Sequence, residues 1–195
     1  MIIGFVRHGE TDWNKEGRSQ GHRDIELNEE GQAQAHAVAK RLSAEQWDIL
    51  ISSDLLRAQE TAQIISQLLK KPVQLDKRLR ERSFGQLEGT TVQERIDRWG
   101  SGWESLDLNV ETLEHMLVRS TELMHELVVR YSGQKILLVS HGTFIAVTLK
   151  HLLGGQEIST LGNTSISVIR KEVDCWQGEM INCFKHLGDG SGLYC

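Results

Sequence analysis

Two stretches of the sequence decide the fold: MIIGFVRHG at residues 1–9 and KILLVSHG at residues 135–142. Each contains an apolar run typical of a buried strand. Each run passes directly into a polar pair and a glycine, so that His8 and His141 both stand where a core strand ends. Glycine lets the backbone turn sharply and lets a ligand approach closely. The two strand ends therefore raise the question of what their imidazole side chains do.

Short apolar or alternating runs elsewhere predict further strands, and apolar residues at helical spacing predict helices between them. The expected strands lie at 2–7, 47–52, 73–75, 135–140, 165–171 and 176–184, the last two as a hairpin. The expected helices are one that Asn28 caps, one that Asp54 caps and Pro72 stops, one that runs from Asn109 to Gly133, and one at 143–153. Residues 76–108 are expected to be irregular.

This alternation of strands and helices predicts an α/β fold, a three-layer α/β/α sandwich whose mixed sheet is mostly parallel. A chain of 195 residues is long enough for one full hydrophobic core and short for two. We therefore expect a single domain over residues 1–195. The glycine-rich tail at 187–195 is expected to be flexible.

Composition and charge exclude several classes of function. The chain is 39% hydrophobic and 25% charged, which is typical of a soluble globular protein. A net charge of −5 argues against a nucleic-acid partner, and no apolar run approaches the length that spans a membrane. The opening residues lack the pattern of a secretory signal, so a cytoplasmic location is expected. The cysteines show no metal-type spacing and are expected to be reduced thiols: Cys175, Cys183 and Cys195.

Both histidines fall where α/β proteins bind ligands. In a mostly parallel sheet, ligands bind beyond the carboxyl ends of the strands, and His8 and His141 follow the carboxyl ends of theirs. Either one alone could be a capping histidine or a hydrogen-bonded core histidine. Two histidines at matching strand ends, one of them directly after Arg7, favour a shared site instead.

Arg57 conflicts with its local environment. It falls in the first turn of the helix expected after Asp54, where the helix dipole disfavours a cation. A bound anion would resolve the conflict, because it would contact the guanidinium and the free backbone N–H groups together. The alternative is an arginine that extends into water. Since paired guanidinium N–H groups match phosphate oxygens, Arg7, Arg57 and the two histidines predict a phosphate site.

Several motifs together resemble the histidine phosphatase superfamily, in the branch that contains cofactor-dependent phosphoglycerate mutases and small broad-specificity phosphatases. They occur in the family's order: RHGET at 7–11 with Asn14 three residues on, GRSQG at 17–21, DIELNEEGQAQA at 24–35, SSDLLRAQETA at 52–62, LRERSFGQLEG at 79–89 and VSHG at 139–142. The motifs cover nearly the whole chain. The resemblance implies the phosphoglycerate mutase-like form of the expected sandwich.

The resemblance also implies roles for individual residues. His8 would be the nucleophile that forms a phosphohistidine, and the cations around it would disfavour its protonation and keep a nitrogen lone pair available. Arg7, Arg57 and His141 would bind the non-bridging oxygens of the phosphate and stabilise the transition state. Glu81 would protonate the leaving oxygen and then activate water. The remaining phosphate-binding residues are expected to be Asn14, Gln20, Gly21 and Gly142.

Some of these residues have simpler explanations. Glu81 stands among several arginines and could form a surface ion pair, in which case Glu88 is the reserve carboxylate. Asn14 could simply satisfy the backbone of its loop. Thr11 is expected to be a turn or cap residue rather than a catalyst.

We expect a metal-independent phosphomonoesterase that uses no cofactor and whose partner is a small organic phosphate substrate. The nearest alternative is a phosphoglycerate mutase, although Ser83 and Phe84 replace a histidine and a tyrosine of the mutase motif. The segment 90–112 also has five acidic against two basic residues, which suits a bisphosphate poorly. Its Trp99 and Trp103 suggest a partly apolar rim. A phosphate-binding protein without catalytic activity is a further alternative. A zinc hydrolase that uses His8 and His141 is disfavoured, because no predicted helix near either motif carries a His, Asp or Glu pair at ligand spacing. The sequence leaves open whether the protein forms a homodimer.

Overall fold

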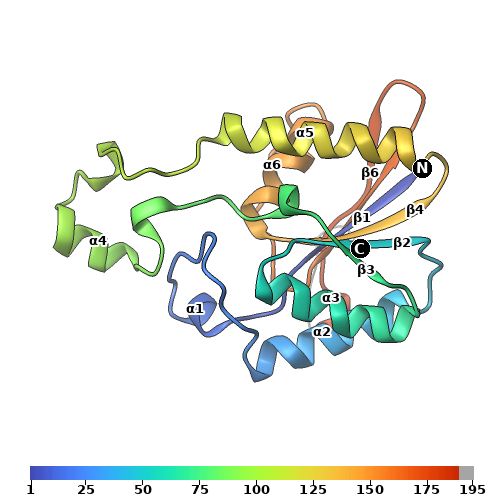
Figure 1. Cartoon of the computed structure of the whole chain (residues 1–195), viewed down its shortest axis with the longest axis horizontal. Helices are drawn as coiled ribbons and strands as arrows, with labels where there is room; N and C mark the ends of the chain where they lie inside the picture. Colours follow the sequence, from blue (N-terminus) through green and yellow to red (C-terminus); the bar gives the residue numbers. More distant parts are fainter. Residues whose placement is uncertain (189–195) are drawn as a thin grey trace.

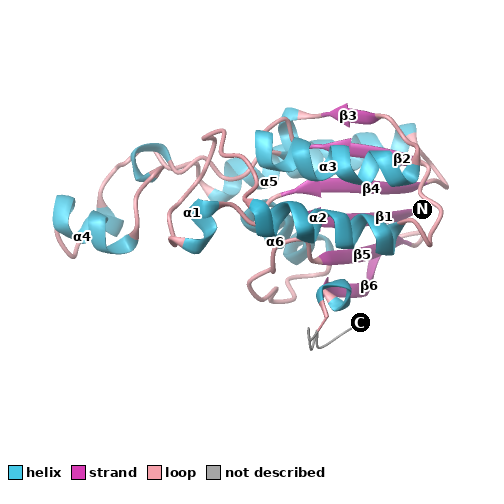
Figure 2. Cartoon of the chain, turned by 90° about the horizontal axis from the view of Figure 1, so that it is seen from below, coloured by secondary structure: helices cyan, strands magenta, loops and turns pink. Residues whose placement is uncertain are grey.

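The computed structural model describes residues 1–188, and its strands form a six-stranded sheet with helices on both faces (Figures 1 and 2). The strands are β1 (Ile2–Arg7), β2 (Ile49–Ser52), β3 (Val73–Leu75), β4 (Lys135–Ser140), β5 (Ile166–Lys171) and β6 (Trp176–Cys183), in the spatial order β3-β2-β4-β1-β5-β6. β1, β4, β2 and β3 pair in parallel, whereas β5 and β6 are antiparallel. The predicted α/β fold with a mostly parallel mixed sheet is confirmed.

Two pairs of helices form the outer layers. α2 (Glu29–Leu42) and α3 (Leu56–Leu69) cover one face of the sheet, and α5 (Leu113–Arg130) and α6 (Gly142–Leu152) cover the other (Figure 1). Successive side chains of a strand point to opposite faces, so Phe5 of β1 packs with α5 and α6 while Val6 packs with α2 and α3. Burial on both faces explains why β1 and β4 are almost wholly apolar.

The start of α3 differs from the prediction. Asp54 does not cap this helix, because its carboxylate accepts a hydrogen bond from Arg80 Nε at 2.6 Å. The backbone N–H of Leu56 instead donates to Asp24 Oδ1 at 2.9 Å, a contact from a distant loop. The first turn of α3 nevertheless contains Arg57, as expected.

The long helix α5 also begins later than predicted. Thr112 caps it and accepts a hydrogen bond from the backbone N–H of His115, so the helix starts at Leu113. Asn109, the predicted start, lies in the left-handed region with φ 57° and therefore cannot continue a right-handed helix.

The expectation that residues 76–108 are irregular is wrong for α4 (Val92–Trp99). Thr91 and Glu94 form a capping box at its start, which is a signal that the sequence carries. Its apolar residues Val92, Ile96 and Trp99 recur at helical spacing. Val92 and Ile96 are nevertheless exposed, because the helix projects from the body of the molecule, with α1 (Asp12–Lys15) near its base (Figure 1). Thr11 caps α1, as predicted.

The cysteine prediction is met at one position and wrong at another. Cys175 is exposed and free. Cys183 is buried and disulfide-bonded rather than reduced, since spacing along the chain does not reveal which thiols meet in space. Cys195 and residues 189–195 of the tail expected to be flexible lie outside the described residues. Within residues 1–188, none of the helices is long and apolar enough to cross a membrane.

Gly4 is the position in β1 where side-chain size is most restricted. A Cβ at this residue would lie 2.6 Å from Cη2 of Trp47 and 3.0 Å from Cδ1 of Leu137. We expect Gly4→Ala to lower the free energy of unfolding by about 1–3 kcal/mol, as overpacking of a close-packed core does. Urea denaturation measures this, with Gly102→Ala as the control because a Cβ at Gly102 meets nothing within 4 Å. Equal stabilities of the two variants would contradict the packing described for β1.

Candidate active site

The register of the two central strands places His8 beside His141. β1 and β4 run in parallel with Arg7 opposite Ser140, so the next residue of each strand leaves the sheet at the same point. The centroids of the two imidazole rings are 5.2 Å apart and the ring planes are inclined by 56°. The carboxyl ends of β1 and β4 therefore meet at one site.

His8 has one ring nitrogen bound to the backbone and the other facing Arg57. Nδ1 lies 2.7 Å from the carbonyl oxygen of Gly9, to which it can only donate, so we assign the hydrogen to Nδ1 and the lone pair to Nε2. Nε2 accepts a hydrogen bond from Arg57 Nε at 3.2 Å. Burial, and then the charges of Arg57 and Arg7, hold the pKa of His8 well below its ordinary value. His8 is thus a neutral imidazole.

His141 is fully buried, and it is neither a capping histidine nor a core histidine with both ring nitrogens hydrogen-bonded. It precedes α6 without making a side-chain capping bond, and its Nδ1 has no hydrogen-bond partner anywhere in residues 1–188. Its Nε2 lies 2.8 Å from Oγ of Ser53. Burial, and then the charges of Arg57 and Arg7, lower the pKa of His141 well below its ordinary value. A buried imidazole nitrogen without a partner is costly unless a ligand contacts it.

Arg57 is buried rather than extended into water, with 1% of its surface exposed. Its Nη1 and Nη2 donate to the carbonyl oxygens of Arg23 and Gly21, each at 2.9 Å. Burial lowers the pKa of Arg57 to about 10, although the charges of Glu81 and Asp24 partly oppose this. These contacts orient the guanidinium but leave its charge without a directly bonded carboxylate.

Arg7 is a second cation of this kind. Its Nη1 donates to the carbonyl oxygen of Leu161, while its buried Nε has no hydrogen-bond partner within the described part of the chain. Burial lowers the pKa of Arg7, and the charge of Glu81 partly opposes this effect. Two arginines without bonded carboxylates at one place favour an anion as the ligand.

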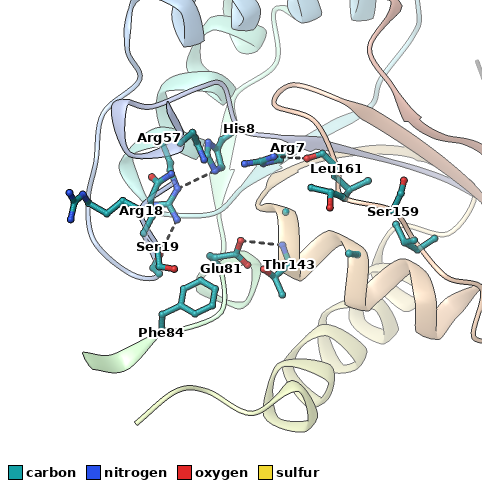
Figure 3. Close-up of a pocket in the computed structure, with 17 residues that line it drawn as sticks. Arg7, His8, Arg18, Ser19, Arg57, Glu81, Phe84, Thr143, Ser159 and Leu161 are labelled. Atoms are coloured by element: carbon teal, nitrogen blue, oxygen red, sulfur yellow. Dashed lines mark hydrogen bonds between the residues drawn. The ribbon is translucent and has the colours of Figure 1, made fainter. Parts of the chain in front are cut away.

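A cavity of about 400 Å³ opens between these side chains (Figure 3). All but one of the nine site residues expected from the sequence line it: Arg7, His8, Asn14, Gln20, Gly21, Arg57, Glu81 and Gly142. The exception is His141, which contacts the ring of His8 but does not itself line the cavity. In Figure 3, His8 and Arg57 lie on one side of the cavity and Glu81 and Thr143 lie on the facing side.

Glu81 forms no surface ion pair among the described residues, which excludes its simpler explanation. Its carboxylate lies at the start of α6, where Oε1 accepts from the backbone N–H of Phe144 and Oε2 accepts from that of Thr143, both at 3.1 Å. Oε1 also accepts from the backbone N–H of Arg82 at 2.9 Å. Glu81 is only 9% exposed, so this carboxyl group is both fixed and sheltered from water.

Glu88, the reserve carboxylate, does not line the cavity. Its Oε1 accepts hydrogen bonds from the backbone N–H groups of His22 at 2.9 Å and Phe84 at 3.2 Å, so it joins two loops behind the site. A Cβ at Gly21, whose φ is +53°, would overlap that same oxygen at 2.0 Å. The glycine is therefore required for both its conformation and its space.

Asn14 and Gln20 present amide groups to the cavity in different ways. Oδ1 of Asn14 accepts from the backbone N–H and the hydroxyl of Thr11, so Asn14 both satisfies its loop and lines the cavity. The amide oxygen of Gln20 is buried with no hydrogen-bond partner among residues 1–188.

The structure adds lining residues that the sequence did not single out as part of the site. They are Arg18, Ser19, Phe84, Thr143, Ala146 and residues 158–161. Leu161 contributes a backbone carbonyl, which leaves no signal in a sequence. The expected rim of Trp99 and Trp103 is wrong, because neither indole lines the cavity and the ring of Trp103 instead stacks on Arg95.

No group of three or more His, Cys, Asp or Glu residues within positions 1–188 could hold a metal ion. At the cavity itself, the groups nearest to His8 are guanidinium cations, which repel a dication.

Comparisons with known proteins agree with this arrangement. A family model described as the histidine phosphatase superfamily (branch 1) matches residues 3–183. The "Uncharacterized phosphatase PhoE" of Bacillus subtilis (strain 168) is 34% identical over 94% of this chain and 95% of its own length. The "Probable phosphoglycerate mutase GpmB" of Enterobacter sp. (strain 638) is 34% identical over 96% of this chain and 95% of its own.

Solved structures give the same result. A mycobacterial glucosyl-3-phosphoglycerate phosphatase, solved as a complex with VO3, superposes with a TM-score of 0.85 at 30% identity, over 93% of this chain and 98% of that one. The expected resemblance is therefore confirmed along almost the whole chain: the protein belongs to the histidine phosphatase superfamily, branch 1.

Proposed function

We propose that this protein is a metal-independent phosphomonoesterase that transfers the phosphoryl group of a small organic phosphate to His8 and then to water. The observation that carries the proposal is the neutral imidazole of His8, whose Nε2 faces a cavity lined by the buried Arg57 and the half-buried Arg7. The names of the Bacillus relative and of the mycobacterial structure, both phosphatases, support the same class of reaction.

In the first step, the hydrogen bond from Arg57 Nε to Nε2 of His8 breaks as Arg57 donates to the phosphate instead, and the freed lone pair of Nε2 attacks phosphorus in line with the leaving oxygen. A P–N bond forms as the P–O bond breaks. Nδ1 keeps its hydrogen and its bond to the Gly9 carbonyl, so His8 loses no proton. Arg7 and Arg57 bind the non-bridging oxygens and stabilise the charge that spreads over them in the transition state. The Ser53 hydroxyl donates to Nε2 of His141, so the hydrogen of that imidazole is on Nδ1. The Nδ1–H of His141, which has no partner among the described residues, is the third donor to these oxygens.

Glu81 acts in both steps from the opposite side of the cavity. As a carboxylic acid it gives its proton to the leaving oxygen, which departs as an alcohol. The resulting carboxylate then takes a proton from water, and the oxygen of that water attacks the phosphohistidine. The P–N bond breaks, inorganic phosphate forms, and the lone pair returns to Nε2. The two backbone N–H groups at the start of α6 hold the carboxyl group in place throughout.

The proposal includes metal independence because this chain supplies the positive charge itself. Phosphoryl transfer needs the charge on the phosphate oxygens neutralised, a task that Mg²⁺ performs in many enzymes. Here Arg7 and Arg57 perform it from a buried site, where charge is poorly screened and acts strongly. Asn14, Gln20, Gly21 and Gly142 complete the proposed phosphate site.

Water rather than a second phosphoglycerate is the proposed acceptor. A mutase must also bind a second anionic group of its substrate, and the further cation that lines the cavity is Arg18. Arg18 is already paired with Glu16 at 2.9 Å and with Glu94 at 2.5 Å, so little of its charge is available. Mutase activity, suggested by the name of the Enterobacter relative, is the second candidate. The cytoplasmic location and the homodimer stay predictions.

His8→Ala should abolish turnover, because no other side chain on the described cavity wall offers a neutral imidazole nitrogen. Rapid quenching of the native enzyme with an aryl phosphate should trap an acid-labile, base-stable phosphoryl group, and turnover should survive exhaustive chelation. The control is His36→Ala, which alters an exposed histidine on α2. Phosphate trapped on a serine, or full activity of His8→Ala, would contradict the proposed nucleophile.

Glu81→Gln should reduce kcat/KM far more for an alkyl phosphate than for p-nitrophenyl phosphate. Alkoxide is a poor leaving group and needs the proton, whereas nitrophenolate departs without it, and general acid catalysis is worth about 10²–10⁴-fold. With the aryl substrate, the variant should lower kcat instead, because hydrolysis of the phosphohistidine loses its base. Steady-state kinetics with both substrates measures this. Equal losses of kcat/KM would assign the proton donor to another group.

A further inference from the structure

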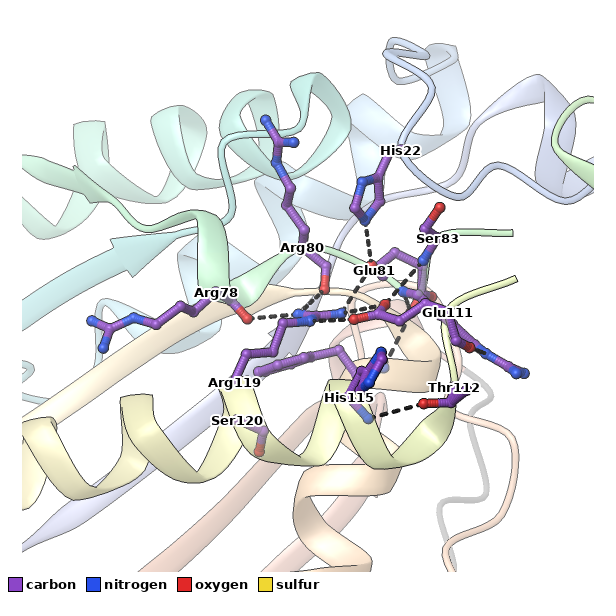
Figure 4. Close-up of polar contacts among 12 residues, drawn as sticks. His22, Arg78, Arg80, Glu81, Ser83, Glu111, Thr112, His115, Arg119 and Ser120 are labelled. Carbon is purple, nitrogen blue, oxygen red and sulfur yellow. Dashed lines mark hydrogen bonds and ion pairs between the residues drawn. The ribbon is translucent and has the colours of Figure 1, made fainter. Parts of the chain in front are cut away.

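Arg119, on α5, uses all five of its N–H donors, and three of them hold the segment that carries Glu81 (Figure 4). Nη1 donates to the carbonyl oxygens of Arg78 and Arg80, each at 2.7 Å, and Nη2 donates to that of Glu81 at 3.0 Å. The remaining two N–H groups bind Glu111. A guanidinium has five such donors in a rigid plane, so this one has no freedom left.

Glu111 fixes the orientation of Arg119. Its Oε1 accepts from Nε at 2.9 Å and its Oε2 accepts from Nη2 at 3.0 Å, which is a bidentate pair. Oε2 also accepts from the backbone N–H of Ser83 at 3.1 Å, and the backbone N–H of Glu111 donates to the Ser83 carbonyl at 2.8 Å. Burial alone would raise the pKa of Glu111, but the hydrogen bonds and charge of Arg119 lower it. The pair therefore holds the chain on both sides of Glu81.

The same guanidinium also contacts the residue that binds the Glu81 carboxylate. It lies 5.0 Å from the ring centroid of Phe144, whose backbone N–H donates to Glu81 Oε1. From another loop, Nε2 of His22 lies 2.8 Å from the Glu81 carbonyl oxygen (Figure 4). The backbone of Glu81 and the start of α6 are thus fixed relative to each other through one side chain.

Arg119 does not line the cavity, and all five of its N–H groups are bound to protein oxygens, so it has no donor left for a substrate. The neighbouring arginines perform other tasks, since Arg78 pairs with Asp76 and Glu126 and Arg80 pairs with Asp54. We propose that Arg119, oriented by Glu111, is a positioning residue that sets the place of the Glu81 carboxyl group relative to the leaving oxygen. This inference rests on the acid–base role proposed above for Glu81. Lysine could not replace Arg119, because an ammonium group has three donors at a single point.

Arg119→Lys tests the proposal because it keeps the charge and loses the planar set of donors. We expect the ratio of kcat/KM for p-nitrophenyl phosphate to kcat/KM for an alkyl phosphate to rise by about tenfold or more, a part of the benefit of general acid catalysis. The rate at which the aryl phosphate forms the phosphohistidine should be unchanged, because nitrophenolate departs without a proton from Glu81. In the double variant Arg119→Lys with Glu81→Gln, the ratio should equal that of Glu81→Gln alone, since no acid remains to be positioned.

The matched control is Arg170→Lys. Arg170 pairs with Glu179 on the β5–β6 hairpin and lies opposite Ile2, at the end of β1 remote from His8. If Arg119→Lys does not fold, Glu111→Gln carries the test with the same expected direction. A rise of the ratio in Glu81→Gln but not in the Arg119 or Glu111 variant, or an equal loss on both substrates, would overturn the positioning role alone. No rise in Glu81→Gln would overturn the role of Glu81 and this inference with it.

Discussion

The parallel pairing of β1 with β4 is the constraint on which the rest of the site depends. Both strands are buried on both faces, so their register is fixed by packing, and that register sets Arg7 opposite Ser140. His8 and His141 then leave the sheet together in a place where both rings are almost fully buried. Burial disfavours the charged form of each ring, and the adjacent arginines add to that effect. A fold requirement thus produces a neutral imidazole beside fixed cations.

The site holds more positive charge than its bonded groups balance, and this excess indicates an anionic ligand. Burying a cation without a bonded counter-ion is costly. Arg57 is buried and Arg7 is half-buried, and neither is bonded to a carboxylate. A polar atom without a partner on His141 adds to the cost. A phosphate group would satisfy all three at once. The carboxyl group of Glu81, by contrast, has its own hydrogen bonds from two backbone N–H groups of α6, and Arg119 binds the Glu81 carbonyl oxygen. These bonds fix the position that a proton donor needs.

The sequence predicts those features that depend on neighbours along the chain. Two features pointed to the site: the histidines directly after buried strands, and the cation Arg57 in a first helical turn. Both break the local rules of an ordinary core, and such exceptions are typical of functional sites. What it could not predict depends on contacts in space. Asp24, from a distant loop, accepts a hydrogen bond from the start of α3, and a backbone carbonyl accepts one from Arg7. The hydrogen bonds of Arg119 join α5 to residues 78–81. The helix α4 is different, because the sequence does carry its signals: a capping box of Thr91 and Glu94, and Val92, Ile96 and Trp99 at helical spacing.

The central claim is that His8 is a neutral imidazole with its hydrogen on Nδ1 and its lone pair on Nε2. Histidine ¹⁵N–¹H correlation spectra recorded between pH 8 and pH 5, with His8→Ala to assign the signals, report the charge and the tautomer directly. The structure predicts that His8 keeps the neutral Nδ1–H form as the pH falls through about 6.5, the ordinary pKa of histidine. An imidazolium at pH 7, or a hydrogen on Nε2, would contradict the claim.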